Sequence, residues 1–528
     1  MVGRNMNSVK STCVLAYKSS QYIGRRFRRL RLADVQTLLI LAFVSLVSLC
    51  PNRLSAEPVL PLHTSGAYLV DADGARVRLN AFSWYGAESK DFVVAGLQIA
   101  DLSSTVQVIK SLGFNTVRLP WSNELFESNP VVDSSKLIAN PSLRGKSALA
   151  VFDEVIGALT KAGIMVILDN HNSNAEWCCG DDGNTLWYNS AYPEANWLID
   201  WKAIAARYKS NPLVIGADLR NEPRVNATWG GNASTDWHAA AQRGGNAVLA
   251  VNPDLLIFVE GIDYSLDLSG VASNPVQLNV GNHLVYSPHD YSYDYSNLSS
   301  FSDYANRIGS RWGYLVSGSH AQPVWMGEFG TCNRSISCVA STSRSDNGLW
   351  FNYLTTYLQQ HSIGWSYWAI NGTQSTGSGR MYGAAESYGV LNPAWNGTAS
   401  AALTTRLGTM ISGTPGFVLL SSGNAQIAST SQDGSTGVTV VPQNGFVGTI
   451  ILSCTVANST ASAKTPTCTV PSSISMKSAD AALVTVNLVT SAANRKASAG
   501  TTSGTYLVTV YARSRTTSSN VQFNVFVQ

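Results

Sequence analysis

Between residues 60 and 412, short runs of apolar and β-branched residues alternate with longer stretches in which apolar residues recur at helical spacing. Two helices are expected at Phe152–Ala162 and Ile199–Tyr208, because each is followed by a helix-ending signal. Repeated strand–helix units predict an α/β domain over residues 60–412, a closed (β/α)8 or TIM barrel. The eight runs expected to be strands are Val77–Tyr85, Asn115–Trp121, Ile164–Asn170, Val214–Arg220, Leu255–Gly261, Leu284–Ser287, Val324–Glu328 and Trp365–Ile370.

The pattern changes beyond residues 413–416, which read GTPG. Residues 417–528 are rich in Ser, Thr, Val, Ala and Gly, contain no Trp, and alternate apolar with polar positions. This alternation predicts a small all-β immunoglobulin-like sandwich over residues 417–528. A carbohydrate-binding module is the alternative, but the region offers few aromatic side chains beyond Tyr506 and Tyr511 for stacking on sugars. Its expected strands are Gly437–Val441, Val447–Leu452, Leu483–Leu488, Thr505–Ala512 and Val521–Val527.

Charge separates the N-terminal segment from the rest of the 528-residue chain. The chain carries a net charge of +3, but residues 1–56 alone carry +8, so the remainder is close to −5. A basic cluster at Arg25–Arg31 precedes the apolar run Thr37–Leu49, which is shorter than the roughly 20 residues that span a bilayer. Residues 1–56 are therefore expected to be an export signal region, with an uncleaved anchor as the alternative. The protein is expected to be secreted, periplasmic or on the cell surface, without a stable membrane span after processing; a nucleic-acid partner is not expected.

Six of the eight cysteines follow the export signal region. An even number in an exported chain favours disulfides. Cys332 is close to Cys338 in sequence, and Cys454 to Cys468, so each is a candidate pair. The adjacent Cys178 and Cys179 are expected either to bond to each other or to exchange with Cys332 and Cys338. A zinc site is the alternative, but only His171 lies nearby and no second CxxC occurs, so no metal or cofactor is expected.

Two glutamates occupy equivalent places in the strand–helix pattern. Glu222 lies in DLRNEP and Glu328 in VWMGEFG, each at the end of an expected strand. In a barrel the carboxyl ends of the strands share one face, so the two side chains should meet in one cleft. A buried glutamate is costly unless it is paired or used in chemistry. Glycoside hydrolysis is a reaction that uses such a pair.

Further polar and aromatic residues lie at or just beyond the ends of the expected strands. Any one of them has a structural alternative, since an isolated histidine or tryptophan more often packs than binds. Their joint order along the chain favours a shared site. The set comprises Arg118, His171, Asn221, His289, Tyr291 and Trp368. The aromatic residues of the loops could each stack on a sugar or fill a loop core, and of these Trp84 and Trp187 are expected to bind substrate. The loop aromatics are Trp84, Trp177, Trp187, Tyr188, Trp229 and Tyr382.

In this order the motifs TVRLPW, LDNH, RNEP, SPHDY, GEFG and WSYWAING resemble glycoside hydrolase family 5, the cellulase-type family of clan A, over roughly residues 60–412. The resemblance implies that Glu222 is the general acid/base and Glu328 the nucleophile of a retaining hydrolase. It also implies roles in substrate binding for the other positions. Arg118 and Tyr291 would hydrogen-bond the nucleophile, Asn221 would bind the sugar 2-hydroxyl, His171 and His289 would line the central subsite, and Trp368 would form its floor.

These observations predict a secreted retaining glycoside hydrolase that acts on a β-linked glucan or a related polysaccharide. The loop Asn172–Asn189 departs from simple cellulases of the family, because it combines Trp177, Cys178 and Cys179 with two aspartates. A long loop at the active face often shapes specificity. The alternatives are an exo-acting glycosidase on glycolipid or furanoside substrates and a non-catalytic glycan-binding protein.

Overall fold

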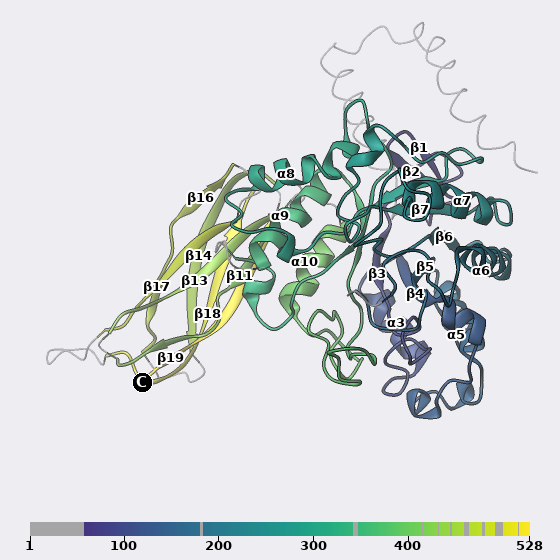
Figure 1. The fold of residues 1–528 in the computed structure, drawn as a ribbon. Coiled ribbons are helices and arrows are strands. Elements are labelled where there is room, and N and C mark those ends of the chain that lie inside the picture. The colour runs from purple at the N-terminus through teal and green to yellow at the C-terminus, as the bar shows by residue number, and fades with distance from the viewer. Residues whose placement is uncertain are drawn as a thin grey trace, which may run out of the picture. The chain divides into compact units, whose positions relative to one another are not determined.

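The computed structural model describes residues 57–528 except 180–182, 342–346, 413–415, 431, 444–445, 459–463, 478–480, 492–499 and 516. The expected export signal at residues 1–56 lies outside the described residues. Within them, eight parallel strands form one sheet in the order β8-β7-β6-β5-β4-β3-β10-β9 (Figure 1). A parallel bridge between Tyr286 and Val324 joins the two ends of this order, so the barrel is nearly closed. The strands are β3 Asn80–Ser83, β4 Thr116–Ser122, β5 Met165–Asn172, β6 Val214–Asp218, β7 Leu256–Glu260, β8 Leu284–Ser287, β9 Trp325–Phe329 and β10 Gly364–Tyr367.

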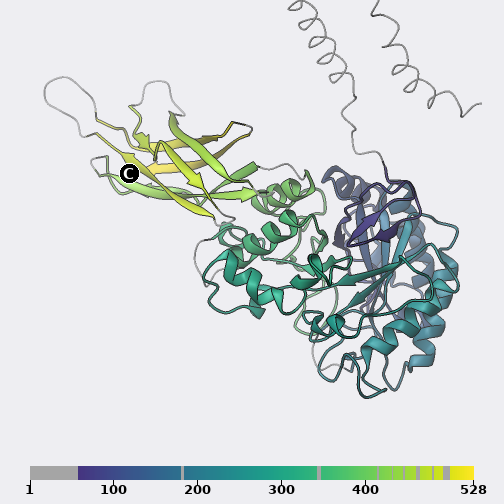
Figure 2. The same cartoon turned by 90° about the horizontal axis from the view of Figure 1, so that it is seen from above.

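Helices between the strands cover the outside of the barrel (Figures 1 and 2). The start of α3 illustrates why they form: the Asp101 side chain accepts a hydrogen bond from the Ser104 N–H, satisfying a donor that has no partner within the helix. In α5, buried Phe152, Val155 and Leu159 recur at helical spacing and face the strands. The helices are α3 Leu102–Ser111, α4 Asn123–Ser128, α5 Ala148–Lys161, α6 Glu194–Arg207, α7 Trp237–Leu249, α8 Phe301–Gly309, α9 Asn347–Gln360 and α10 Ala401–Ser412.

The interior at the start of the strands is apolar. A hairpin of β1 (His63–Ser65) and β2 (Tyr68–Val70) contributes Leu62 and Leu69 to a buried cluster there. The strands supply the remaining members, among them Met165, Phe258 and Trp325. Because this end is filled with hydrocarbon, polar residues inside the barrel are confined to the opposite end, where the strands finish.

The C-terminal region is an all-β module of two sheets with one shared core, as the alternating pattern predicts. In β17 the even-numbered residues Val484, Val486 and Leu488 are buried and their odd-numbered neighbours are exposed, as expected for a strand with one face on a core. The first sheet has the order β11-β13-β17-β15, and the second β12-β19-β18-β14-β16. The strands are β11 Gly416–Ser421, β12 Ala425–Ile427, β13 Gly434–Gln443, β14 Gly448–Asn458, β15 Thr467–Thr469, β16 Ser473–Met476, β17 Ala482–Val489, β18 Gly504–Arg513 and β19 Ser518–Val527.

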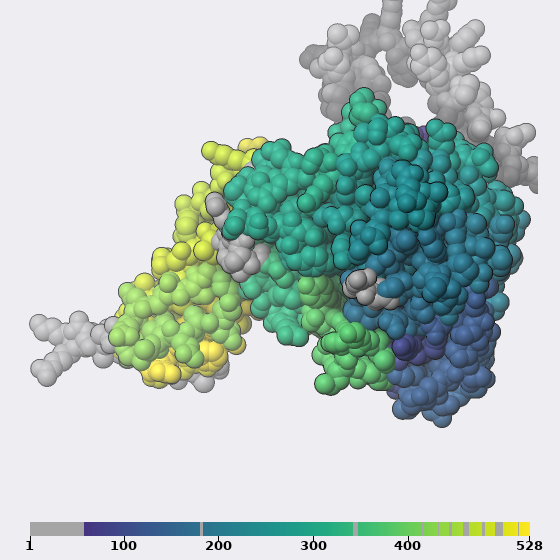
Figure 3. Space-filling model, in the orientation of Figure 1, coloured from purple at the N-terminus to yellow at the C-terminus, as the bar shows by residue number. Residues whose placement is uncertain are grey.

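The loop after β10 packs against the segment that follows β3, the first strand of the barrel. In Figure 3 it forms the green lobe beside the purple residues that follow β3. The two segments are bonded directly, since the Thr376 N–H donates to Asp91 at 2.7 Å and the Tyr85 N–H donates to Asn371 at 3.2 Å. This contact extends one wall at the C-terminal end of the strands. No helix in the part of the chain that the structure describes has the length and apolar content needed to cross a bilayer.

Two of the expected disulfides are present in the described residues. Cys332 bonds Cys338 in the segment after β9. Cys454 in β14 bonds Cys468 in β15, and therefore joins the two sheets of the C-terminal module. Both pairings confirm the sequence-based candidates.

Removing the inter-sheet disulfide should destabilise the C-terminal module. The bond closes a loop with a sequence separation of 14, and a loop of this length restricts the unfolded chain by about 3 kcal/mol. Calorimetric unfolding of Cys454→Ala/Cys468→Ala should show the module's transition at lower temperature, with turnover of a soluble substrate unchanged. The matched variant Cys332→Ala/Cys338→Ala removes a disulfide with a sequence separation of only 6, so its free energy of unfolding should fall by less. An unchanged transition in the first variant would contradict the account.

Candidate active site

The sequence-predicted residues meet at the carboxyl ends of the barrel strands. Arg118 is in β4, His171 in β5 and Glu328 in β9, while Asn221 and Glu222 follow β6. His171, Glu222 and Glu328 line a cleft of about 610 Å³, and Arg118 and Asn221 are buried behind this lining. Its lining includes His171, Trp177, Cys178, Cys179, Glu222, Tyr264, His289, Tyr291, Tyr293, Glu328, Trp368, Arg380 and Glu386. The arrangement gathers two carboxylates, two imidazoles and several aromatic rings around one opening.

Glu328 is oriented by two donors. Its Oε1 accepts from the Tyr291 hydroxyl at 2.8 Å, and its Oε2 accepts from the Arg118 guanidinium at 3.1 Å. Burial raises the pKa of Glu328, and the positive charges of His289 and Arg118 act in the opposite direction. Both carboxylate oxygens are thus engaged by side chains that favour the ionised form, which is the form that a nucleophile needs.

Glu222 has different neighbours. Its Oε1 lies 2.9 Å from Nδ1 of His289, and its Oε2 lies 3.9 Å from the sulfur of Cys178. A carboxylate oxygen of Glu222 and one of Glu328 lie within 4.8 Å of each other. Two glutamates at this distance, one with a guanidinium and the other with an imidazole, form an asymmetric pair.

The backbone at Glu222 is unusual. Its φ of 47° falls in the left-handed region, which non-glycine residues seldom adopt. The Glu222 N–H donates to the Glu260 carboxylate at 2.7 Å, and Pro223 follows directly. This hydrogen bond holds the turn that points the Glu222 side chain into the cleft.

Arg118 lies at the centre of a buried charge network. It donates to Asp218 at 2.8 Å and to Glu260 at 2.9 Å, and Asp169 lies 3.1 Å from it. The Arg118 side chain is fully buried. Although burial opposes the charge, these carboxylates and Glu328 raise the pKa of Arg118 well above its ordinary value, so the guanidinium stays protonated. Arg118 also donates to Asn221 Oδ1 at 2.9 Å, which fixes the amide of Asn221.

The carboxylates around Arg118 differ in the direction of their pKa shifts. Burial and the neighbouring Glu260 raise the pKa of Asp218 well above its ordinary value, which favours its protonated form. Glu260 behaves oppositely: although burial favours its proton, His289 and Arg118 hold its pKa at about 2. Glu260 therefore supplies the anion that accepts from the Glu222 backbone.

The neighbours of the two histidines favour the protonated form of each imidazole. His289 lies 3.3 Å from Glu260, and despite burial the charges of Glu260 and Glu328 raise its pKa well above its ordinary value. His171 lies 2.7 Å from Asp169, which raises its pKa although burial acts against it. Each imidazole therefore favours its protonated form and can donate hydrogen bonds to oxygen atoms in the cleft.

Trp368 lines the cleft and packs against two flat neighbours. Its ring stacks on Tyr85 with centroids 5.1 Å apart and on His171 with centroids 5.5 Å apart. The Trp177 ring meets the Tyr85 ring edge-on at 5.1 Å, and the Arg380 guanidinium lies 3.9 Å from the Trp177 centroid. Tyr85 is buried, so Trp177 and Trp368 are the rings of this group that can offer an apolar face to a sugar.

Trp84 and Trp187 are core residues, so the sequence-based expectation that they contact substrate is wrong. Both side chains have an exposed fraction of 0%. Trp84 donates to the Ala95 carbonyl, and Trp187 donates to Glu194. The loops after β3 and β5 turn these indoles away from the cleft. Trp177, from the same group of loop aromatics, does line it.

Several residues of the site were not identified from the sequence. Glu260 ends β7, and Asp169 and Asp218 lie in LDNH and DLRNEP, so their places as acidic residues at strand ends could have identified them. Arg380 and Glu386 lie in the loop after β10. They form an ion pair that also contacts the Tyr85 hydroxyl, and nothing in the local sequence indicates it.

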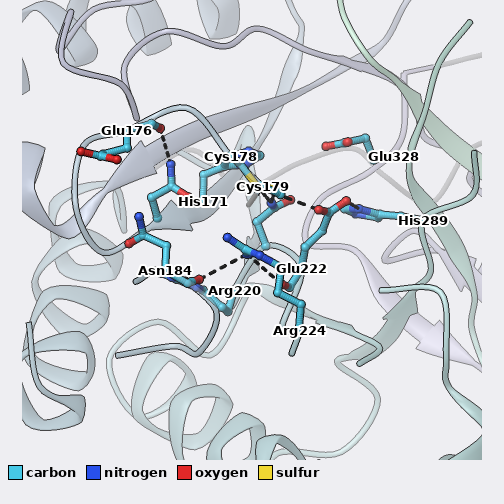
Figure 4. The surroundings of a disulfide bond; sticks show 12 residues. His171, Glu176, Cys178, Cys179, Asn184, Arg220, Glu222, Arg224, His289 and Glu328 are labelled. Atoms are coloured by element: carbon cyan, nitrogen blue, oxygen red, sulfur yellow. Dashed lines mark hydrogen bonds and ion pairs between the residues drawn. A yellow bond between two sulfur atoms is a disulfide. The ribbon is translucent and has the colours of Figure 1, made fainter. Parts of the chain in front are cut away.

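Cys178 and Cys179 bond to each other, which decides between the pairings left open by the sequence. Figure 4 shows this disulfide in the cleft wall between His171 and Glu222. The Asn221 amide lies 3.4 Å from the sulfur of Cys178 and 3.7 Å from that of Cys179. The disulfide is thus part of the site.

Asp290 is bonded to the strand that carries Glu328. Its carboxyl accepts from Trp350 at 2.6 Å, Tyr295 at 2.7 Å and Tyr304 at 3.1 Å, while its backbone N–H donates to the Glu328 carbonyl at 3.1 Å. Burial raises the pKa of Asp290 to about 7. The residue precedes Tyr291, so its anchoring positions the strand end that presents the tyrosine.

Comparison with known proteins places the chain among polysaccharide hydrolases. The family model described as Cellulase (glycosyl hydrolase family 5) matches residues 70–374. An endoglucanase of Paenibacillus polymyxa is 40% identical over 58% of this chain and 79% of its own length. The major extracellular endoglucanase of Xanthomonas campestris is 35% identical over 57% of this chain and 63% of its own length.

Solved structures give the same picture. The catalytic domain of the major endoglucanase from Xanthomonas campestris superposes with a TM-score of 0.57 at 30% identity, covering 67% of this chain and 100% of that one. A cellotetraose complex of the endocellulase from Pyrococcus horikoshii superposes with a TM-score of 0.56 at 28% identity, covering 66% of this chain and 98% of that one.

The Asp290 carboxyl should make stability fall as the pH rises. Its folded pKa of about 7 lies above the ordinary value of 3.8, so its contribution is fully present below pH 3.8 and is lost as the pH rises through 7. Asp290→Asn keeps the acceptor for Trp350 but does not ionise. From pH 4 to pH 8, urea unfolding should show the variant gaining up to about 4 kcal/mol relative to the parent. A difference that is independent of pH would show that Asp290 is already ionised in the fold.

Proposed function

The chain belongs to glycosyl hydrolase family 5, the cellulase family, and from this premise we propose that it is a secreted, retaining endo-acting hydrolase of β-linked glucans. Its enzymatic class, an O-glycosyl hydrolase, follows from the family. The observation that carries the retaining mechanism is the distance of at most 4.8 Å between a carboxylate oxygen of Glu222 and one of Glu328. Retaining enzymes hold their two carboxyl groups about 5 to 5.5 Å apart, too close for the intervening water of an inverting reaction.

In the first step Glu328 attacks the anomeric carbon while Glu222 gives its proton to the departing glycosidic oxygen. Tyr291 and Arg118 hold the two oxygens of Glu328, so the attacking carboxylate is oriented before substrate binds. The attack breaks the glycosidic bond and forms a glycosyl ester on Glu328. In the second step Glu222 takes a proton from water, and the resulting attack on the anomeric carbon releases the sugar and restores Glu328.

The remaining residues bind the sugar at the cleaved bond. Asn221, fixed by Arg118, holds its amide nitrogen beside the sulfur atoms of Cys178 and Cys179 in the cleft wall, from where it would donate to the 2-hydroxyl, and hydrogen bonding there strengthens towards the transition state. Trp368 would form the floor beneath this sugar, with His171 donating from beside it. His289 would hold the Glu222 carboxyl in position.

The proposed substrate is a β-linked glucan chain. The two relatives with 35% and 40% identity are described as endoglucanases, and a related endocellulase was solved with cellotetraose. An exo-acting enzyme on a glycolipid or furanoside is the competing hypothesis. A relative described as an endoglycoceramidase of Rhodococcus hoagii, 26% identical over 45% of this chain, supports a glycolipid substrate but not exo action. The loop that carries Trp177 and the disulfide would decide between the two substrate classes, because a long loop at the active face often shapes specificity.

We also propose a three-part organisation: an export signal region at residues 1–56, the catalytic domain at 60–412 and an immunoglobulin-like module at 417–528. Export agrees with a relative described as a major extracellular endoglucanase. The C-terminal module is proposed as a spacer or stabilising module. In its described part Tyr511 is exposed, but Tyr506 is buried and so cannot join it in a stacking platform.

Hydrolysis of a soluble β-1,4-glucan should give oligosaccharides of mixed length early in the reaction, with the anomeric configuration retained. Proton NMR of the first-formed ends and chromatographic sizing measure both properties in one experiment. Glu328→Gln is the matched control, because it conserves volume but cannot attack, and it should be folded and inactive. Inverted ends would contradict the assigned roles, and a single small product would favour the exo-acting hypothesis.

Glu222→Ala should affect substrates according to their leaving groups. A glycoside with a poor leaving group should lose about 10²- to 10⁴-fold in rate, whereas an activated aryl glycoside should still form the glycosyl-enzyme. Deglycosylation then stalls because no base activates water. Azide needs no deprotonation, so added azide should restore turnover and give a glycosyl azide. A uniform loss across substrates without rescue by azide would remove Glu222 from the mechanism.

A further inference from the structure

The Cys178–Cys179 disulfide is exposed to the cleft at the acid/base. Both cysteines are half-buried and line the cleft. Figure 4 shows the sulfur atoms beside Glu222, whose Oε2 lies 3.9 Å from the sulfur of Cys178. In the described part of the chain, Cys178 and Cys179 are the only cysteines in the lining of this cleft. A change in their chemistry therefore acts directly on Glu222.

This disulfide contributes little to stability through chain entropy. Its sequence separation of 1 hardly restricts the unfolded chain, in contrast to the separation of 14 between Cys454 and Cys468. An exposed bond of this kind is the one that reductants reach first.

The loop keeps its place by contacts that do not depend on the disulfide. The Asn172 side chain donates to the Glu176 carbonyl at 2.6 Å, and the Ala175 N–H donates to Glu124 at 2.7 Å. The Trp177 ring packs between Tyr85 and the Arg380 guanidinium. With the residues before the cysteines anchored in this way, reduction leaves both sulfur atoms beside Glu222.

The three side chains match the ligand set of a thiophilic divalent cation. One sulfur from each cysteine and one carboxylate oxygen of Glu222 all lie within 4.8 Å of one another. Two thiolates and a carboxylate supply three ligands of a tetrahedral zinc site and leave the fourth for water. Thiolate sulfur favours Zn²⁺ and Cd²⁺ over Mg²⁺ and Ca²⁺.

We propose that reduction of the Cys178–Cys179 disulfide creates an inhibitory site for Zn²⁺, in which Glu222 is the third ligand. A trialkylphosphine supplies the two electrons and becomes a phosphine oxide with oxygen from water, while the disulfide takes up two protons and gives two thiols. Each thiol releases its proton to solvent when its sulfur binds the metal. A Glu222 carboxylate bound to Zn²⁺ has no proton to donate, so glycoside cleavage stops. The inhibition rests on the proposed role of Glu222, whereas metal binding does not.

The test uses the full chain and Co²⁺ as a spectroscopic probe for the zinc position. The enzyme is reduced with a trialkylphosphine, freed of reductant without oxygen, and titrated with Co²⁺. The reduced enzyme should show sulfur-to-cobalt charge-transfer absorption that Zn²⁺ abolishes, and the oxidised enzyme should show none. Zn²⁺ should lower turnover of an aryl glycoside by about tenfold or more only after reduction, and a chelator should restore it.

Matched variants locate the site. Cys178→Ser/Cys179→Ser keeps every other cysteine and should lose the cobalt absorption, whereas Cys332→Ser/Cys338→Ser should retain it. Glu222→Gln should keep the sulfur ligands but weaken cobalt binding by about tenfold or more. Absorption that persists in Cys178→Ser/Cys179→Ser, or that never appears after reduction, overturns the proposal. Cobalt binding without loss of turnover overturns the inhibition and contradicts the catalytic role of Glu222, while the metal site itself stands.

Discussion

The buried guanidinium of Arg118 is the interaction on which the rest of the cleft depends. Its neighbours Asp169, Asp218, Glu260 and Glu328 are all buried acids. Such a group of acids could not be held together without a cation, and a cation could not be buried without the acids. Because the guanidinium and the acids offset the cost of burying one another, each residue of the network is held in place. Since the acids lie in β5, β6, β7 and β9, the network ties these four strands to Arg118 in β4.

The same network makes two chemically similar glutamates different. Glu328 is bonded directly to the Arg118 guanidinium, while Glu222 is linked to it indirectly, because Glu260 accepts from the Glu222 backbone as well as from Arg118. The Glu222 side chain instead lies between an imidazole and a disulfide. A difference in surroundings rather than in residue type thus supports the separate roles of nucleophile and acid/base.

The barrel and the centre of its site were predictable from sequence because both depend on strand ends. Each expected barrel strand is present, and His171, Asn221, Glu222 and Glu328 lie at or just beyond strand ends by rule of topology, whereas Arg118 lies inside β4, four residues before its end. Whether a loop aromatic faces solvent, core or cleft depends on the path of the loop, which local sequence does not encode. Trp84 and Trp187 pack inwards while Trp177 lines the cleft for this reason. The Arg380–Glu386 pair could not be predicted from the sequence either, since it forms against Tyr85, nearly 300 positions away.

The left-handed backbone of Glu222 places the proposed acid/base in a conformation that is costly for residues other than glycine. A side chain in this conformation costs about 1 to 3 kcal/mol, and here a second carboxyl group lies close by. Glycine would remove this backbone cost, but it would also remove the carboxyl group that is proposed to donate the proton. Residue 222 is therefore a position where selection for thermal stability alone would act against the proposed catalysis.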